Sequence, residues 1–242
     1  MNGKLFRRVL HLLLPTTCAL CGAVSDETLC AACADQFFGA ALAARSPRCR
    51  CCANPVATGA AWCGHCIVSR PAFDHTVVAC DYALPLDQLV LQLKFGHRLA
   101  LAALMARQLA AAVQRDVDCA AALPDLLCPV PLGPRRLAQR GYNQALEIAR
   151  PLARSLGVTL HARLVARIRE TAAQSSVAPA HRRANIAGAF ALAEPALVRG
   201  RHVGVVDDVM TSGGTLDEMA AVLKRHGAAR VSNFVFARTP PH

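Results

Sequence analysis

An apolar strand, two carboxylates and a turn of small residues follow one another in His202-Val-Gly-Val-Val-Asp207-Asp208-Val-Met-Thr211-Ser212-Gly213-Gly214-Thr215. Helical spacing of apolar residues then runs from Thr215 to His226 and stops before Gly227. A further apolar strand is predicted at Arg230–Phe236. A strand, a helix and a second strand in this order are typical of a βαβ unit, in which both strands are parallel.

The same alternation continues upstream of this segment. Strands are predicted at Val77–Tyr82 and Leu126–Pro131, and helices at Leu86–Lys94, Leu99–Val113 and Asn143–Leu156, the last kinked at Pro151. The fold class is therefore α/β, with a parallel sheet flanked by helices. Residues 1–70 are instead rich in turns and poor in periodic patterns. We expect a small domain over residues 1–70, beginning with a short amphipathic helix, and an α/β domain over residues 71–242.

The turn after the two carboxylates suits a ribose phosphate. Its glycines let the backbone approach closely, and the helix N-terminus presents N–H groups and a positive dipole to a phosphate. The carboxylates would accept hydrogen bonds from ribose hydroxyls and help to hold Mg²⁺. The candidate residues are Asp207 and Asp208 as catalytic groups, with Val209, Met210, Thr211, Ser212, Gly213, Gly214 and Thr215 around the phosphate and ribose.

An ordinary capped helix is the alternative explanation of this segment, because Asp, Thr and Ser are also good turn and N-cap residues. Other phosphate motifs do not occur. The chain contains neither GxxxxGK[ST] nor a GxGxxG after a strand, which argues against an ATPase or a dinucleotide enzyme.

Four Cys-x-x-Cys pairs indicate metal binding in the N-terminal domain. Each pair can present two thiolates to one tetrahedral ion, so eight cysteines predict two structural zinc sites with no open coordination position. The predicted ligands are Cys18, Cys21, Cys30, Cys33, Cys49, Cys52, Cys63 and Cys66. An iron–sulfur cluster or a redox dithiol set is the alternative. Sequential and interleaved pairing both remain open, and Cys51 could replace Cys49 or Cys52, whereas His65 is expected to be a bystander.

Composition narrows the class of protein. Of 242 residues, 54% are hydrophobic, which is enough for a core, yet the apolar run Val9–Leu14 is far shorter than the roughly 20 residues of a membrane span. No small-residue cleavage site precedes Cys18, so we expect a cytoplasmic protein rather than a secreted disulfide framework. The formal net charge of +11 favours polyanionic partners only weakly.

The acidic turn resembles the phosphoribosyl-pyrophosphate loop of type I phosphoribosyltransferases, and nearly the whole chain resembles the ComF family. The resemblance rests on the order of six features. These are the four cysteine pairs, Leu93-Lys94-Phe95, the segment Pro129–Gln144 with Arg140-Gly141-Tyr142-Asn143-Gln144, Thr171-Ala-Ala-Gln174, Arg182–Phe190 and the Asp207-Asp208 turn. It implies a double zinc ribbon followed by a phosphoribosyltransferase-like domain.

The resemblance also implies further ligand contacts. The loop Pro129–Pro134 would lie near the pyrophosphate, with Arg135, Arg136, Arg140, Asn143 and Gln144 close by. Residues 169–188 would correspond to the loop that covers the site, where Gln174, Arg182 and Asn185 are the candidates. Lys94 could reach a phosphate or serve only as a charge at a helix C-terminus.

Three functions follow as hypotheses. The first is a phosphoribosyltransferase-like protein that binds phosphoribosyl pyrophosphate or a related ribose phosphate with magnesium, with glycosyl transfer as a further step. The second, implied by the resemblance, is a DNA uptake factor in natural transformation that binds single-stranded DNA, partners a competence helicase and associates peripherally with the membrane. Its aromatic candidates in the ribbon region are Phe37, Phe38 and Trp62, which we expect in the core. The third is a scaffold with a decayed site, against which the intact Asp207-Asp208 pair argues.

Overall fold

A five-stranded sheet forms the centre of the molecule. The computed structural model describes residues 17–39, 47–116, 118–119, 122–169 and 188–240. The strands lie in the order β1-β7-β6-β2-β3, and every neighbouring pair is parallel. Their bounds are β1 His75–Asp81, β2 Leu126–Pro129, β3 Thr159–Leu160, β6 His202–Met210 and β7 Arg230–Arg238. The expected parallel α/β sheet is confirmed, and the carboxyl ends of its strands share one edge.

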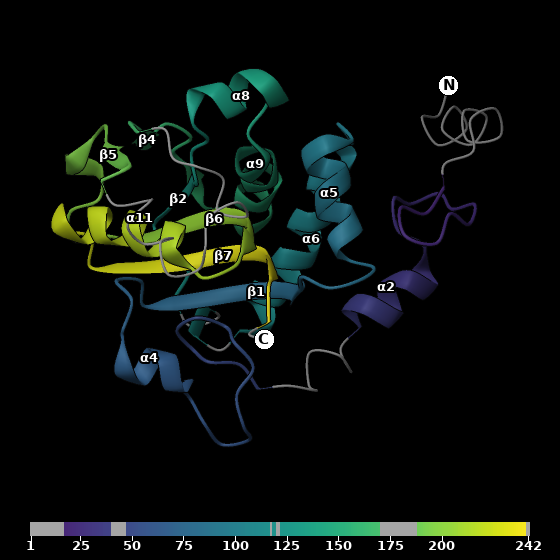
Figure 1. Cartoon of the computed structure of the whole chain (residues 1–242), viewed down its shortest axis with the longest axis horizontal. Helices are drawn as coiled ribbons and strands as arrows, with labels where there is room; N and C mark the ends of the chain where they lie inside the picture. The colour runs from purple at the N-terminus through teal and green to yellow at the C-terminus, as the bar shows by residue number, and fades with distance from the viewer. Residues whose placement is uncertain (1–16, 40–46, 117, 120–121, 170–187, 241–242) are drawn as a thin grey trace.

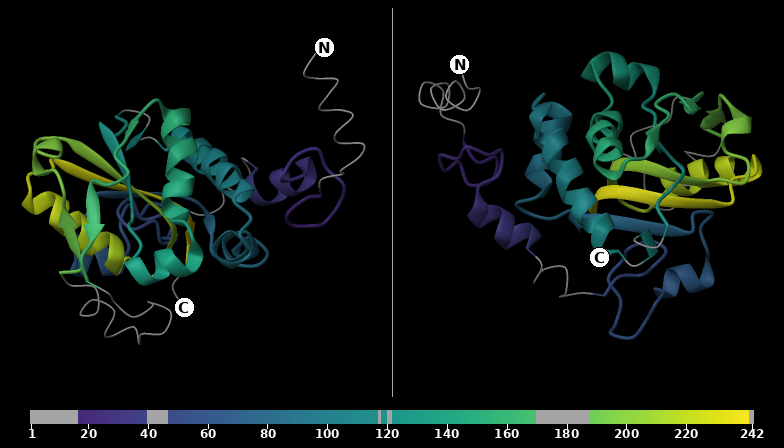
Figure 2. Two further views of the ribbon diagram at one scale, coloured as in Figure 1. Left: turned by 90° about the horizontal axis from the view of Figure 1, so that it is seen from above. Right: turned by 180° about the vertical axis from the view of Figure 1, so that it is seen from behind.

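Helices cover both faces of this sheet (Figure 1). Helices α5 (Asp87–Phe95), α6 (Ala100–Arg115) and α9 (Gln144–Leu156) lie on one face, and α11 (Gly214–Arg225) lies on the other. Figure 2 shows the two helix layers on either side of the strands. Because both faces are covered, the central strands β6 and β7 are almost wholly buried.

Alternation along β6 and β7 divides the core into two halves. Val206, Phe234 and Phe236 belong to the cluster with α5, α6 and α9, whereas Val205 and Val235 belong to the cluster with α11. Successive strand residues point to opposite faces, so each central strand supplies both clusters. The sheet is thus held from both sides, which fixes the carboxyl end of β6.

Several short elements were not predicted from the sequence. They include helix α8 (Pro134–Arg140), the antiparallel hairpin of β4 (Val165–Arg167) and β5 (Phe190–Leu192), strand β3 and the 3₁₀ helix η3 (Pro195–Leu197). Each is too short to show a clear apolar period. The hairpin lies against α11, and the N–H of Ile168 donates to the carbonyl of Ala189 at 2.8 Å.

The N-terminal region contacts the sheet at two places. Helix α2 (Ala31–Phe38) lies beside β1, and the rings of Phe38 and Phe236 are 6.2 Å apart. The segment around α4 (Gly64–Val68) lies below β1 in Figure 1. Phe37, Phe38 and Trp62 are all partly buried against the core. The expected helix before residue 15 falls outside the described residues.

Candidate functional site

Two aspartates lie near the carboxyl end of β6. Asp207 is 9% exposed and Asp208 is 2% exposed, so both carboxyl groups are almost removed from water. Asp207 Oδ1 accepts a hydrogen bond from the N–H of Asp208 at 2.9 Å. Ligands of open parallel sheets bind at this edge of the strands.

Two other elements contact Asp208, and a third reaches it through Gln144. Lys94 Nζ, at the end of α5, lies 2.6 Å from Asp208 Oδ2, and Gln144 Nε2, at the start of α9, donates to Asp208 Oδ1 at 3.3 Å. Arg140, the last residue of α8, donates from Nη1 to Gln144 Oε1 at 2.5 Å. The guanidinium of Arg140 also lies 5.4 Å from the ring centre of Phe95. The acidic pair is therefore joined to a chain of cationic and amide groups.

This environment shifts the pKa values of the two carboxyl groups in opposite directions. Burial raises the pKa of Asp207, and the neighbouring charge of Asp208 raises it further. Burial also acts to raise the pKa of Asp208, but the ammonium of Lys94 outweighs it and holds that pKa below its ordinary value. Asp208 is thus the charged member of the pair. A second cation at the site would favour ionisation of both.

The turn after β6 leads into helix α11, whose N-terminus has no side-chain cap. Gly213 has φ 84°, a backbone conformation that favours glycine. A Cβ there would lie 2.6 Å from Met210 Cε, the end of a flexible side chain that can shift. Gly213 is also the N-cap of α11 and offers no side chain to the first turn. The alternative of a helix capped by an Asp, Ser or Thr side chain is therefore not observed. Thr211 and Ser212 are exposed at the turn, and Gly214 and Thr215 open the helix.

The other predicted contacts are placed differently. Arg135 and Arg136 lie on α8, exposed and half-buried respectively. Asn143 is the N-cap of α9: its Oδ1 accepts from the N–H of Ala145 at 3.0 Å, and its Nδ2 donates to the carbonyl of Val130 at 3.0 Å. Asn143 therefore positions the segment after β2. The candidates Gln174, Arg182 and Asn185 fall outside the described residues.

Arg238 is a site residue that the sequence reasoning missed. Only 5% exposed at the end of β7, it donates from Nη1 to the carbonyls of Met210, Thr211 and Thr239, and from Nε to the carbonyl of Cys52 at 3.1 Å. It therefore ties the turn after β6 to the N-terminal region. A charged residue at the end of an apolar strand was the one available signal.

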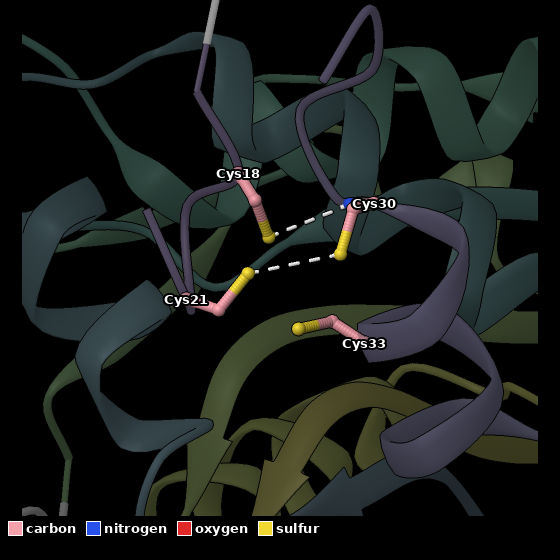
Figure 3. Close-up of side chains that lie close together, drawn as sticks. All are labelled: Cys18, Cys21, Cys30 and Cys33. Carbon is pink, nitrogen blue, oxygen red and sulfur yellow. Dashed lines mark hydrogen bonds between the residues drawn. The ribbon is translucent and has the colours of Figure 1, made fainter. Parts of the chain in front are cut away.

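The eight predicted cysteine ligands form two groups of four in sequential order. Figure 3 shows the sulfur atoms of Cys18, Cys21, Cys30 and Cys33 pointing toward one another. Cys21 Sγ lies 3.7 Å from Cys30 Sγ, and Cys52 Sγ lies 3.5 Å from Cys63 Sγ. Four sulfurs at about 2.3 Å from a tetrahedral zinc are about 3.8 Å apart, so both groups fit that ion closely.

The two tetrads have the same local backbone structure. In each, the first pair lies on a tight turn and the second pair begins a helix, with Cys30 and Cys63 as N-caps. The fourth residue after the first cysteine is left-handed in both turns, with φ 73° at Gly22 and φ 57° at Ala53. Equivalent backbone turns thus hold both tetrads, and the second keeps this conformation despite a Cβ.

Two neighbouring candidates lie outside the tetrads. Cys51 donates from Sγ to the carbonyl of Phe73 at 3.6 Å, and the second group of four contains Cys49 and Cys52 but not Cys51. His65 is exposed and belongs to neither tetrad.

The leading cysteine of each tetrad is prepared as a thiolate. Burial acts to raise the pKa of Cys18, but backbone N–H donors such as those of Cys21 and Cys30 lower it to about 6. The same balance lowers the pKa of Cys49 to about 7. Thiolates are the form that binds zinc.

Known proteins share both parts of this chain. A phosphoribosyl transferase domain model matches residues 143–241, and a double zinc ribbon model matches residues 9–67. The DNA utilization protein YhgH of Salmonella typhimurium is 37% identical over 232 residues, covering 94% of this chain and 99% of that protein. Competence protein F of Haemophilus influenzae is 32% identical, covering 89% of this chain and 92% of that protein. The chain belongs to the ComF family.

Two more distant similarities accompany this ComF-family assignment. Ribose-phosphate pyrophosphokinase 3 of Oryza sativa is 62% identical over 37 residues, which are 15% of this chain and 9% of that protein. The glutamine phosphoribosylpyrophosphate amidotransferase structure from B. subtilis aligns with TM-score 0.36 and 18% identity, over 55% of this chain and 26% of that chain.

Proposed function

We propose that this ComF-family chain binds phosphoribosyl pyrophosphate, or a related ribose 5-phosphate, in the turn between β6 and α11. One observation carries the proposal: two buried carboxyl groups stand at the end of β6, and five residues after Asp208 a left-handed Gly213 begins a helix that has no side-chain cap. Nothing in the folding of a strand and a helix requires two adjacent buried acids. Burying ionisable groups costs folding free energy unless they are paired, and clusters of such groups gather at functional sites.

Different residues would contact the phosphate and the ribose of this ligand. The 5-phosphate would accept hydrogen bonds from N–H groups of the turn and the first turn of α11, with the hydroxyls of Thr211, Ser212 and Thr215 as added donors. The ribose hydroxyls would donate to Asp207 and Asp208. The short match to a ribose-phosphate pyrophosphokinase supports a ligand of this class.

The same carboxylates suit magnesium as a companion of the ligand. Mg²⁺ prefers oxygen donors and is usually held by one or two carboxylates together with substrate phosphates. Asp207 and Asp208 supply two carboxylates, and the ligand would supply the remaining oxygens. Lys94 already lies 2.6 Å from one oxygen of Asp208, so it provides the positive charge there before the ligand arrives.

Glycosyl transfer is the further step of this proposal. The bond between ribose carbon 1 and the pyrophosphate oxygen would break, pyrophosphate would leave with the bonding pair, and a nucleophile would bond to carbon 1. Arg135 and Arg136 on α8 could stabilise the leaving charge, with Gln174, Arg182 and Asn185 from the segment expected to cover the site.

Calorimetry tests the binding proposal. Wild type is titrated with phosphoribosyl pyrophosphate and with ribose 5-phosphate, each with and without Mg²⁺. We expect saturable heat that Asp207→Asn/Asp208→Asn abolishes. Asp125→Asn is the matched control, because Asp125 Oδ2 accepts from the N–H of His202 at 2.7 Å at the opposite end of β6. No heat from the wild type, or equal heat from the double variant, would remove the proposal.

A second candidate function is the handling of single-stranded DNA. It is favoured by relatives named DNA utilization protein and competence protein F, and by the net charge of +11. A cytoplasmic location, a helicase partner and peripheral contact with the membrane belong to this candidate. No described helix is long and apolar enough to cross a bilayer. We expect the full chain to bind labelled single-stranded DNA with an affinity that falls steeply with salt; absence of binding at low salt would rule it out.

A further inference from the structure

A third group of metal-binding side chains is separate from the acidic site and shares no residue with either tetrad. His75 begins β1, while Asp116 and Cys119 follow the end of α6. One donor atom of each residue lies within 4.8 Å of the other two. His75 Nε2 is 3.0 Å from Asp116 Oδ1, a separation that two ligands of one small cation can adopt.

A neighbouring carboxylate lies on the other side of the histidine ring. Asp118 Oδ2 lies 3.8 Å from His75 Nδ1, on the side of the ring away from Asp116. A histidine that binds metal through one nitrogen commonly has a carboxylate or carbonyl at the other, which fixes the ring and its tautomer. Asp118 is itself paired with Arg50 Nε at 3.5 Å.

The group is closed on one side and open on the other. Cys119 is fully buried and the side chain of His75 is 5% exposed, whereas that of Asp116 is 24% exposed. His75, Asp116 and Asp118 line a groove of about 600 Å³ that runs along β1. Arg48 and Arg115 also line this groove. A cation held here would therefore have one side toward solvent.

Hydrogen bonds already tie these side chains together. Asp116 Oδ1 accepts from the N–H of Cys119 at 2.9 Å and lies 3.0 Å from His75 Nε2. The side chain of Cys119 also contacts the carboxyl group of Asp116, so sulfur, imidazole and carboxyl share one small volume. A thiolate, an imidazole and a carboxylate together match the donors that zinc accepts.

We propose that His75 Nε2, a carboxylate oxygen of Asp116 and the thiolate of Cys119 bind a third zinc ion. The two anionic ligands neutralise the ion, so its charge is compensated in the buried setting. The fourth position faces the groove and takes water. Three protein ligands and one open position distinguish this site from the two closed tetrads.

Zinc counting by native mass spectrometry tests the proposal. Full-length protein is equilibrated with Zn²⁺, and loosely bound ions are removed. We expect three zinc ions in the wild type and two each in Cys119→Ala and His75→Gln. Cys80→Ala is the control for loss of a buried cysteine, because Cys80 lies in β1 and donates only to the carbonyl of Phe236 at 3.4 Å. This control should retain three.

X-ray absorption at the zinc edge supplies an independent readout. The wild type should show nitrogen and oxygen scattering beside sulfur, and His75→Gln should show sulfur alone. Should Cys119→Ala fail to fold, His75→Gln decides the matter by both measurements. Two zinc ions in the wild type would overturn the proposal, as would a third zinc that persists in both variants.

Discussion

The backbone conformation of Gly213 and its proposed contact with a ligand can be tested separately. An alanine in the left-handed region costs about 1 kcal/mol or somewhat more. Gly157, at the end of α9, shares this conformation with φ 68°, but no atom lies within 4 Å of its added Cβ. The two glycines therefore form a matched pair, one at the turn after β6 and one remote from it.

Gly213→Ala should lose ribose-phosphate binding, whereas Gly157→Ala should not. Both variants should be destabilised by about 1 kcal/mol, because both place a Cβ at positive φ. Urea unfolding measures the stability and calorimetry the affinity. Equal affinity of the two variants would mean that the turn does not contact the ligand.

Lys94 acts through its charge on Asp208. Removing one partner of a largely buried ion pair leaves the other uncompensated, which is strongly destabilising. The side chain of Lys94 retains 23% exposure, which weakens the effect. The consequence is a testable coupling between α5 and β6.

Lys94→Met should destabilise the protein by about 2 kcal/mol, somewhat less than for a fully buried pair. Asp208→Asn in the same background should recover part of this loss, because the unpaired charge is then gone. Urea unfolding of the two single variants and the double variant measures the coupling. Strictly additive effects would contradict the ion pair.

The acidic pair and the glycines after it could be predicted because they lie close together in the sequence. A strand, two acids and a glycine turn are consecutive residues, so their chemistry can be read without knowing the fold. Lys94 and Gln144 reach Asp208 only because α5 and α9 pack on the same face of the sheet. The sequence could suggest that they were near a ligand, but not that they act on the carboxylate.

At the scale of elements, two turns of the same form support two tetrads. Alanine at position 53 adopts φ 57°, which an L-residue does at a cost, so the second turn stores strain that bound zinc would offset. The predicted ligands and their number were readable from spacing. Which cysteine pairs combine into one tetrad could not be read from the spacing, because it depends on where α2 and α4 place the second pair of each tetrad.

Cys52→Ala should remove one zinc ion and lower the melting temperature, whereas Cys51→Ala should keep the full zinc content. Both residues are buried neighbours, but only Cys52 lies in a tetrad. Zinc analysis and thermal unfolding measure the two effects. Loss of zinc from Cys51→Ala would show that Cys51 is the ligand.

Sequence prediction succeeded for strands that are buried on both faces of the sheet and failed for strands of two or three residues. Strands β6 and β7 have nine residues each and are almost entirely buried, so their apolar runs are clear. Strand β3 has two residues and β4 and β5 have three each, and partners far along the chain decide their pairing. The pleat and helix periods cannot appear in so few residues.

At the scale of the whole molecule, Arg238 joins the N-terminal region to the candidate site. One guanidinium contacts the carbonyls of Met210 and Thr211 and the carbonyl of Cys52, a member of the second tetrad. Arg48 adds a second link through Asp81 at 3.0 Å. The second tetrad is thus connected to the backbone that would bind phosphate.

Arg238→Met should destabilise the protein by about 3 kcal/mol, because several buried carbonyls lose their donor. It should also weaken ribose-phosphate binding about tenfold, since the turn loses its support, and Arg238→Lys should restore less than half of either loss. Urea unfolding and calorimetry provide the two readouts. Unchanged affinity in Arg238→Met would show that the turn is rigid without this link.

Backbone amide signals of the turn give the most direct test of the central claim. Isotope-labelled protein is titrated with ribose 5-phosphate and Mg²⁺, and the NMR signals of Gly213, Gly214 and Thr215 are followed, with Gly157 as the remote reference. We predict large, saturable shifts at the three turn residues and none at Gly157. Saturating ligand that leaves the three signals unmoved would contradict the account.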